Sequence, residues 1–254
     1  LRALTESGQA DDTVVVFLSD HGMPFPLAKT CLYHHSTRTP WMVRWPGQIK
    51  PGIHDTEHMI SALDLLPTLL DVAEIEHPNG LEGHSFYRVL KGKKQPELDH
   101  VIKEYNESSG RRRHPMRAVQ SKQFNYIFNP WAAGGRKFQA AGQGTLTYQE
   151  MIAKAEMDPR TSKLLKQYDY RVVEEFFDIE SDPDNLNNLI DDPKFQDEIA
   201  NHRAILDQWM EKTKDPVHTA FQNREDLRYL DGFVEAQQAQ AFRRRDVERE
   251  RNLK

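Results

Sequence analysis

The most apolar stretch near the start of the chain covers residues 13–18, where valines and other apolar residues follow one another without a polar interruption. Such a run, rich in β-branched residues and without alternation, predicts a strand buried on both faces, as in parallel sheets. It ends at the polar segment 19–22, whose glycine favours a turn. Residues 39–45 form a second short strand candidate that is closed by a Pro-Gly pair.

Further along, apolar residues recur at helical spacing. A helix is predicted from about Asp64, which is available as its cap, and Pro67 is tolerated in the first turn. The apolar stripe of this helix consists of Leu66, Leu69, Leu70 and Ala73. Residues 1 to about 95 therefore predict an α/β arrangement in which strands alternate with helices.

From about residue 99 the pattern changes to short β-prone runs separated by polar turns. These runs cover residues 101–105, 117–120, 124–128 and, after a helical stretch near 148–168, residues 174–179. This arrangement predicts a small antiparallel sheet rather than further α/β layers.

A strong amphipathic helix is predicted after this sheet, beginning at Asp192-Pro193 with proline at its first position. Its apolar face carries Phe195, Ile199, His202, Leu206 and Trp209. After about residue 220 the chain is rich in Gln and Arg and lacks a wide apolar stripe, which predicts a peripheral helix or partial disorder. We therefore expect an α/β part at 1–98, a C-terminal subdomain at 99–220 and a charged tail at 221–254.

Composition narrows the class of protein. The 254 residues carry a formal net charge of −5, which argues against a general nucleic-acid binder. No apolar run is long enough to predict a transmembrane helix. A single cysteine, Cys31, excludes an internal disulfide framework and a zinc site built from cysteines. The first residues resemble the end of a helix without an initiator Met, so we expect the C-terminal part of a longer chain.

Candidate chemistry lies at the end of the first strand. In open α/β sheets ligands bind at the carboxyl ends of strands, where Asp20 and His21 would lie. An Asp beside a His can supply two ligands to one cation, and Lys29 in the following loop could neutralise a bound sulfate or phosphate. The alternative is an ordinary turn with an Asp cap, an incidental His and a solvated Lys.

The combined spacing of several motifs resembles the second half of type I sulfatases in the alkaline-phosphatase superfamily. The motifs are Leu18-Ser19-Asp20-His21-Gly22, Lys29, Arg38-x-Pro40, Arg44-Trp45-Pro46-Gly47, the helix 61–71, and the late segment 176–183 followed by Asn188-Leu189. Within that family the chain is most similar to the heparan N-sulfatase branch. The similarity to this branch rests on residues 22–26, 115–120 and 209–216.

The resemblance implies a fold, a cofactor and site roles. The fold would be the C-terminal part of an alkaline-phosphatase-like sandwich, a mostly parallel sheet flanked by helices, with a small antiparallel subdomain and a packed helix. Asp20 would ligate the active-site cation, Ca²⁺ in most sulfatases, while His21 suits Mn²⁺ or Zn²⁺ better and could instead contact the sulfate or leaving group. Lys29 would hold the sulfate. The nucleophile, a formylglycine made from a Cys-x-Pro-Ser-Arg motif, would lie in the N-terminal half, so this chain would carry half of the site.

Other residues have two interpretations each. Cys31 does not fit the nucleophile motif and is expected to be a small buried or loop thiol. His34 and His35 are either sugar contacts or a solvated pair, and Arg117 is a further candidate for substrate contact. The run 111–114 is either a solvated loop or a contact for an anionic glycan, because Arg forks suit sulfate and carboxylate.

Three functions therefore remain open from the sequence. The first is a sulfohydrolase acting on sulfated glycans, with N-sulfoglucosamine of heparan-type chains as the expected substrate. The second is a phosphate or phosphonate ester hydrolase of the same superfamily. The third is a non-catalytic glycan-binding relative. The resemblance also implies a periplasmic, secreted or lysosomal protein, and the oligomeric state is open.

Overall fold

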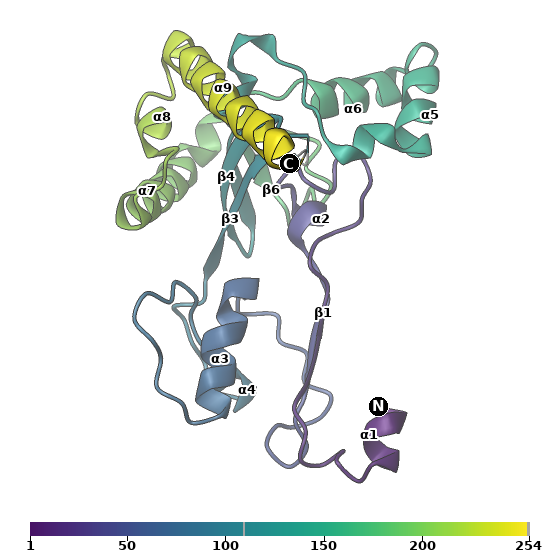
Figure 1. The fold of residues 1–254 in the computed structure, drawn as a ribbon, viewed down its shortest axis with the longest axis vertical. Helices are drawn as coiled ribbons and strands as arrows, with labels where there is room; N and C mark the ends of the chain where they lie inside the picture. The colour runs from purple at the N-terminus through teal and green to yellow at the C-terminus, as the bar shows by residue number, and fades with distance from the viewer. Residues whose placement is uncertain (109, 253–254) are drawn as a thin grey trace. The chain divides into compact units, whose positions relative to one another are not determined.

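The structure is a computed structural model that describes residues 1–108 and 110–252. Contacts divide the chain into two compact units (Figure 1). The first unit comprises residues 1–21 and 38–101, and the second comprises residues 22–37 and 102–254. Residues 22–37 thus pack with the C-terminal part of the chain, although the predicted domain at 1–98 includes them. The division into parts at 1–98, 99–220 and 221–254 stays a prediction.

The first unit holds a two-stranded sheet and short helices. β1 (Val15–Leu18) pairs antiparallel with β2 (Trp41–Arg44), with Val15 opposite Arg44. Both strands lie where the sequence predicts them, but the expected parallel pairing and burial on both faces are wrong within this chain. Because a sheet of two strands covers little of its own surface, Phe17 and Met42 remain more than half exposed. The helices are α1 (Arg2–Glu6), η1 (Ala62–Asp64), α3 (Leu65–Val72) and α4 (Tyr87–Leu90).

The start of the predicted helix at Asp64 is formed differently from the expected cap. Ser61 caps the short turn η1, and the Asp64 carboxylate accepts hydrogen bonds from the backbone N–H of Ser61 at 2.7 Å and of His84 at 2.7 Å. α3 then begins one residue later. Leu66 and Leu69 of its predicted apolar stripe are exposed in this chain, so the helical spacing is confirmed while the expected burial of these two side chains is not.

The second unit is built on a four-stranded sheet in the order β3-β4-β5-β6. Its strands are β3 (His100–Glu107), β4 (Arg113–Ser121), β5 (Phe124–Phe128) and β6 (Glu174–Asp178). β4 pairs antiparallel with β5, and β5 with β6, as the sequence predicts. The helices are α2 (His34–Thr37), η2 (Pro130–Gly135), η3 (Ala141–Gly144), α5 (Leu146–Ala155), α6 (Pro159–Asp169), η4 (Pro193–Phe195), α7 (Gln196–Thr213), α8 (His218–Gln222) and α9 (Leu227–Asn252).

Alternating residues of this sheet build two apolar clusters, because successive side chains of a strand point to opposite faces. Ala118, opposite Ile127, belongs to the cluster that includes residues 31–33 and the tyrosines of α5 and α6. Val119, opposite Tyr126, belongs to the cluster covered by α7, α8 and α9. The expected α/β fold with a small antiparallel subdomain and a packed helix is confirmed.

The C-terminal segment is more ordered than the sequence predicts. Residues 227–252 form the long helix α9, which lies across the sheet in Figure 1. Leu230, Val234 and Ala241 of this helix are buried. They share one narrow face of the helix, which a composition dominated by Gln and Arg conceals. Among the described residues, no helix combines the length and the apolar character that crossing a membrane requires.

Candidate functional site

The turn after β1 carries the predicted metal ligands. The Ser19 hydroxyl donates to the His21 carbonyl oxygen at 3.0 Å and closes the turn. Asp20 Oδ2 lies 3.4 Å from His21 Nε2, and the Asp20 side chain is 84% exposed against 36% for His21. The pair therefore presents a carboxylate and an imidazole side by side. Among residues 1–108 and 110–252, no group of three or more His, Cys, Asp or Glu side chains could hold a metal ion.

The segment that follows, residues 22–37 of the second unit, is folded back on itself by backbone hydrogen bonds. The Gly22 N–H donates to the Ser36 carbonyl oxygen at 2.9 Å. A Cβ at Gly22 would lie 2.0 Å from the His35 carbonyl oxygen, so only glycine permits this close approach. The Lys29 N–H donates to the Met23 carbonyl oxygen at 3.1 Å. These bonds give Lys29 a defined place in a folded loop rather than on a free tip.

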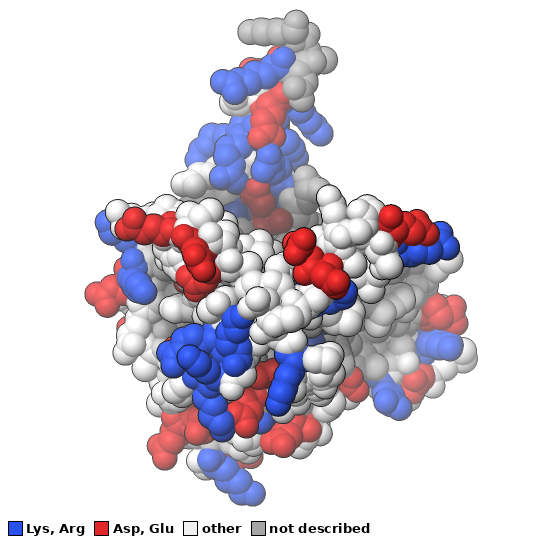
Figure 2. All heavy atoms as spheres, turned by 90° about the horizontal axis from the view of Figure 1, so that it is seen from below, with Lys and Arg blue, Asp and Glu red and all other residues white. Residues whose placement is uncertain are grey.

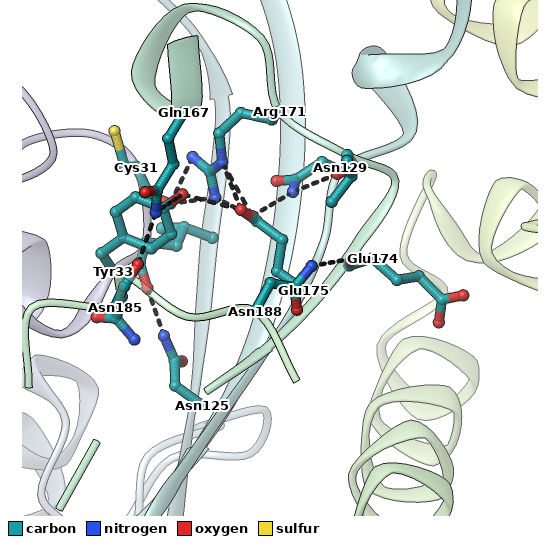
Figure 3. A network of polar contacts seen from close by, with 12 residues as sticks. Cys31, Tyr33, Asn125, Asn129, Gln167, Arg171, Glu174, Glu175, Asn185 and Asn188 are labelled. Atoms are coloured by element: carbon teal, nitrogen blue, oxygen red, sulfur yellow. Dashed lines mark hydrogen bonds and ion pairs between the residues drawn. The ribbon is translucent and has the colours of Figure 1, made fainter. Parts of the chain in front are cut away.

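Residues 31–33 anchor this loop in a buried polar network (Figure 3). The Arg171 guanidinium donates to the Cys31 carbonyl oxygen at 3.3 Å and pairs with Glu175, to which the Tyr33 hydroxyl donates at 2.8 Å. Arg171 also lies 4.1 Å from the centre of the Tyr33 ring. The side chains of Cys31, Tyr33 and Arg171 have almost no exposure, so the network fixes the loop on which Lys29 lies.

Cys31 itself is a buried free thiol, as the sequence predicts. Its desolvation raises the pKa to about 11, which keeps the sulfur protonated near neutral pH. A buried and protonated thiol is a poor nucleophile. Cys31 therefore contributes to the packing of the apolar core.

Lys29 lines a hollow of about 730 Å³ in the second unit. Arg112 and Lys137 supply two further cations, and Glu107 is the one carboxylate among the residues that line it. Aromatic, amide and hydroxyl groups complete the lining, from Thr30, Tyr105, Ser108, Gln139, Gln143 and Tyr148. Although the chain is acidic overall, Lys and Arg side chains gather in patches between acidic ones on the face drawn in Figure 2. The lining of the hollow is basic, which suits an anion that also carries hydroxyl groups.

Lys137 and Glu107 are both charged at neutral pH. Hydrogen bonds to Tyr148 and Asp169 raise the pKa of Lys137. Burial opposes the charge of Glu107, but its hydrogen bond with Arg111 and the nearby arginines hold its pKa below the usual value. The cations of the hollow therefore outnumber its carboxylate under physiological conditions.

The two neighbouring histidines lie on α2 and have partners within the second unit. The His34 N–H donates to Asn185 Oδ1 at 2.8 Å, and its Nδ1 lies 3.2 Å from Gln120 Nε2. His35 Nε2 lies 2.9 Å from Asp184 Oδ1, and the His35 side chain is 48% exposed. Neither histidine lines the hollow at Lys29. Their contact with a sugar stays a prediction.

Arg117 is placed in the interior. Its side chain is 1% exposed, and its Nε donates to Asp215 Oδ2 at 2.8 Å. Further donors reach the Tyr105 carbonyl oxygen at 3.3 Å and Asn106 Oδ1 at 3.1 Å. Because these contacts use most of its donors, Arg117 acts in the structure as a buried tie between β4, β3 and the end of α7. Substrate contact by Arg117 stays a prediction that the geometry does not favour.

Sequence reasoning missed most of the hollow. Lys137 follows Gly134 and Gly135, which both adopt positive φ, and this kinked segment gave no recognisable motif. Tyr105 and Tyr148 lie on a strand and a helix far apart in the sequence. Only the basic run 111–114 offered a usable signal, and of its residues Arg112 lines the hollow.

Comparison with known proteins identifies the chain. A family model described as N-sulphoglucosamine sulphohydrolase, C-terminal, matches residues 21–130. The chain is 30% identical over 227 residues to N-sulphoglucosamine sulphohydrolase from Homo sapiens, covering 85% of this chain and 45% of that protein. An ulvan-active sulfatase from Formosa agariphila is 28% identical over 212 residues, covering 83% of this chain and 35% of that protein.

The fold agrees with these matches. A solved structure described as a 2-O GAG sulfatase superimposes with a TM-score of 0.62 at 25% identity, over 86% of this chain and 40% of that chain. The chain thus has the fold of the alkaline-phosphatase superfamily. Within that superfamily it belongs to the sulfatases and corresponds to their C-terminal part. It spans less than half the length of each of these relatives.

Proposed function

We propose that the protein containing this chain hydrolyses sulfate groups of saccharides. The observation that carries this proposal is the hollow of the second unit, where Lys29 lies with Arg112 and Lys137 among tyrosine, amide and hydroxyl groups. Cations of this kind suit the sulfate oxygens, and the remaining groups suit the hydroxyls of a sugar. Membership of the sulfatase family supports the reaction class.

The chemistry of Asp20 and His21 supports a role in holding a divalent cation. The exposed Asp20 carboxylate offers the oxygen ligands that Ca²⁺ prefers, whereas the His21 imidazole suits Mn²⁺ or Zn²⁺ better. Because Ca²⁺ takes about six to eight ligands, these two residues would form only part of its shell. Such a cation, when bound, would polarise the sulfate group as a Lewis acid.

Lys29 would hold the sulfate oxygens as charge moves during cleavage of the S–O or S–N bond. We further propose that the nucleophile is a formylglycine outside this chain, so that the chain carries half of the site. The 254-residue chain expressed alone should then release no sulfate from any substrate tested. Measurable turnover by that chain would show that the catalytic group lies within it.

The proposed substrate is an N-sulfoglucosamine residue of a heparan-type chain. The similarity to the human N-sulphoglucosamine sulphohydrolase supports it, while the similarity to a solved structure described as a 2-O GAG sulfatase supports O-sulfated glycans as the alternative. The amide of Gln139 in the hollow suits the hydroxyl groups that both substrate types carry.

The test uses the full-length protein with three substrates: N-sulfoglucosamine, glucosamine 6-O-sulfate and a phosphonate monoester. Sulfate release from the first substrate, with kcat/KM at least tenfold above that for the second, is the expected result. A preference for the O-sulfated sugar would overturn the N-sulfate assignment but keep the sulfatase. Hydrolysis of the phosphonate ester alone would overturn the sulfatase function. Loss of turnover on chelation, restored by Ca²⁺ rather than Mn²⁺, would support the metal assignment.

A further inference from the structure

A second hollow of about 510 Å³ lies beside the first, between the β3–β4 connection and α9. The two hollows share Arg112, Lys137 and Gln139, so they form one continuous lining. Each has a volume within the range of about 300–1,000 Å³ that is typical of ligand sites. We propose that the second hollow binds a further acidic sugar, sulfated or carboxylated, of a polyanionic chain whose end occupies the first hollow. This inference rests on the proposed function.

Arg112 is the central cation of this second site. It is exposed, it lies between the two hollows, and its guanidinium carbon is 5.2 Å from the centre of the Phe242 ring. In the part of the chain that the structure describes, no carboxylate lies within ion-pair distance of Arg112. Among the described residues, no acidic side chain therefore competes with an incoming anion for its N–H donors.

The position of Arg112 is fixed by α9. Gln238 of this helix donates from Nε2 to the Arg111 carbonyl oxygen at 2.8 Å and accepts from the Arg113 N–H at 3.0 Å. These two bonds hold the backbone on both sides of Arg112. The Arg111 side chain adds an ion pair with Glu248 of the same helix, at 2.6 Å. A cation held this way loses less conformational freedom on binding than a solvated loop residue would.

The other cations of the second hollow are oriented by acidic partners. Arg113 donates to Glu107 Oε2 at 3.4 Å, Arg136 pairs with Asp231, and Lys137 pairs with Asp169 at 2.9 Å. These three cations and Arg112 line the hollow, against Glu235 as the one carboxylate of its lining. The charges of these three cations are thus balanced by carboxylates, Glu235 also pairing with Arg136, and among the described residues Arg112 supplies the positive charge of this hollow that no ion pair offsets.

The chemistry of the lining favours an acidic saccharide over a nucleic acid. Phe242 offers an apolar ring for a sugar, and Gln139 offers an amide for a hydroxyl group. A nucleic-acid site would call for a broadly basic surface that follows the phosphate backbone, whereas this chain has a net charge of −5. The lining of the two hollows gathers five cations, Lys29, Arg112, Arg113, Arg136 and Lys137, which suits one or two acidic groups at a time.

The test is direct binding by calorimetry in the full-length protein, with a heparin hexasaccharide and with monomeric N-sulfoglucosamine as probes. We expect the hexasaccharide to bind more tightly, and R112E to weaken its binding by roughly tenfold or more. R112K should recover part of the loss, because it restores the charge without the planar fork. R160E is the matched control: Arg160 is exposed on α6, outside both hollows, and the same charge reversal there should leave binding unchanged.

Two results would overturn the second site. One is hexasaccharide binding that R112E weakens no more than R160E does, with both variants folded by circular dichroism. The other is equal or tighter binding of a single-stranded oligonucleotide of matched charge, which would replace the saccharide. Sulfate release from monomeric N-sulfoglucosamine, measured in parallel on the unmodified protein, reports on the proposed function alone, so the failure of one does not imply the failure of the other.

Discussion

The two units of the chain are stabilised in different ways. Among the described residues, nearly all buried apolar side chains belong to the second unit, and Pro67, Phe86 and Leu98 belong to the first. Both apolar clusters and the Arg171–Glu175 pair lie in the second unit. The first unit instead exposes Phe17 and Met42 on its two strands.

This contrast teaches which chemistry each unit can support by itself. The second unit holds Lys29 on a loop whose neighbours are buried and hydrogen-bonded, so its hollow is preorganised. The first unit presents Asp20 and His21 at the end of a strand that is covered on few sides. Function in the first unit is therefore expected to depend on exposed side chains, and stability of the chain to depend on the second.

The largest effect is expected from Asp20→Asn in the full-length protein. The change removes the charge that would hold the cation, so turnover of a sulfated substrate should fall by several orders of magnitude. The side chain is 84% exposed, so the free energy of unfolding should hardly change. Kinetics together with urea denaturation measure both quantities. Activity close to that of the unmodified protein would remove Asp20 from the site.

Arg171→Met, in the second unit, should instead lower the stability of the protein strongly. Arg171 Nε lies 3.0 Å from Glu175 Oε1, and neither side chain is more than 4% exposed. Removing one partner leaves a buried carboxylate unpaired, which costs about 3–5 kcal/mol of unfolding free energy. The double change Arg171→Met with Glu175→Leu is the control and should cost less. Equal losses for the single and double variants would mean that the charge is not the cause.

Lys29→Ala is expected to lower kcat/KM by about 10²–10³, the scale for losing one preorganised donor. Residues 31–33 anchor the loop that carries Lys29. The substitution should therefore change the protein's free energy of unfolding far less than its activity. Lys29→Arg should restore part of the rate if charge alone matters. Rates within about twofold of the unmodified protein on N- and O-sulfated substrates would make Lys29 a bystander.

The second unit should also carry an acid sensitivity through His114. Its burial against Trp131 and Phe138 lowers its pKa to about 4 from 6.5. Between these pH values the unfolded chain takes up a proton that the folded chain refuses, so stability falls as the pH falls. The loss reaches about 3 kcal/mol near pH 4. His114→Phe should flatten this dependence in denaturation curves from pH 7 to pH 4, and an unchanged slope would assign it to other groups.

The smallest effect is expected for Phe17→Thr on the exposed side of β1. In the 254-residue chain this change should alter the unfolding free energy by less than about 0.5 kcal/mol. The reason is that the Phe17 side chain is 56% exposed and buries little apolar surface on folding. Phe177→Ala in the second unit is the comparison and should cost about 3–5 kcal/mol. Urea denaturation measures both. A large cost for Phe17→Thr would show that β1 is covered in solution.

Much of the fold follows from short-range patterns. The runs at 101–105 and 124–128 alternate or cluster as strands do, and β3 and β5 contain them. The apolar face of α7 was correct for Ile199, His202 and Leu206, which are buried. The combined spacing of several motifs, from Leu18-Ser19-Asp20-His21-Gly22 to Asn188-Leu189, indicated the family. These signals are local, because period, turn chemistry and motif spacing are properties of neighbouring residues.

The tertiary structure decides which residues far apart in the sequence contact one another. The pairing of β1 with β2, the burial of Arg117 on Asp215 and the packing of Leu230 on the sheet each join residues far apart in the sequence. The hollow at Lys29 is lined by separate segments that no motif links. A sequence specifies each side chain's chemistry and local geometry, but burial and charge pairing depend on which distant surfaces fold together, and only the tertiary structure determines that.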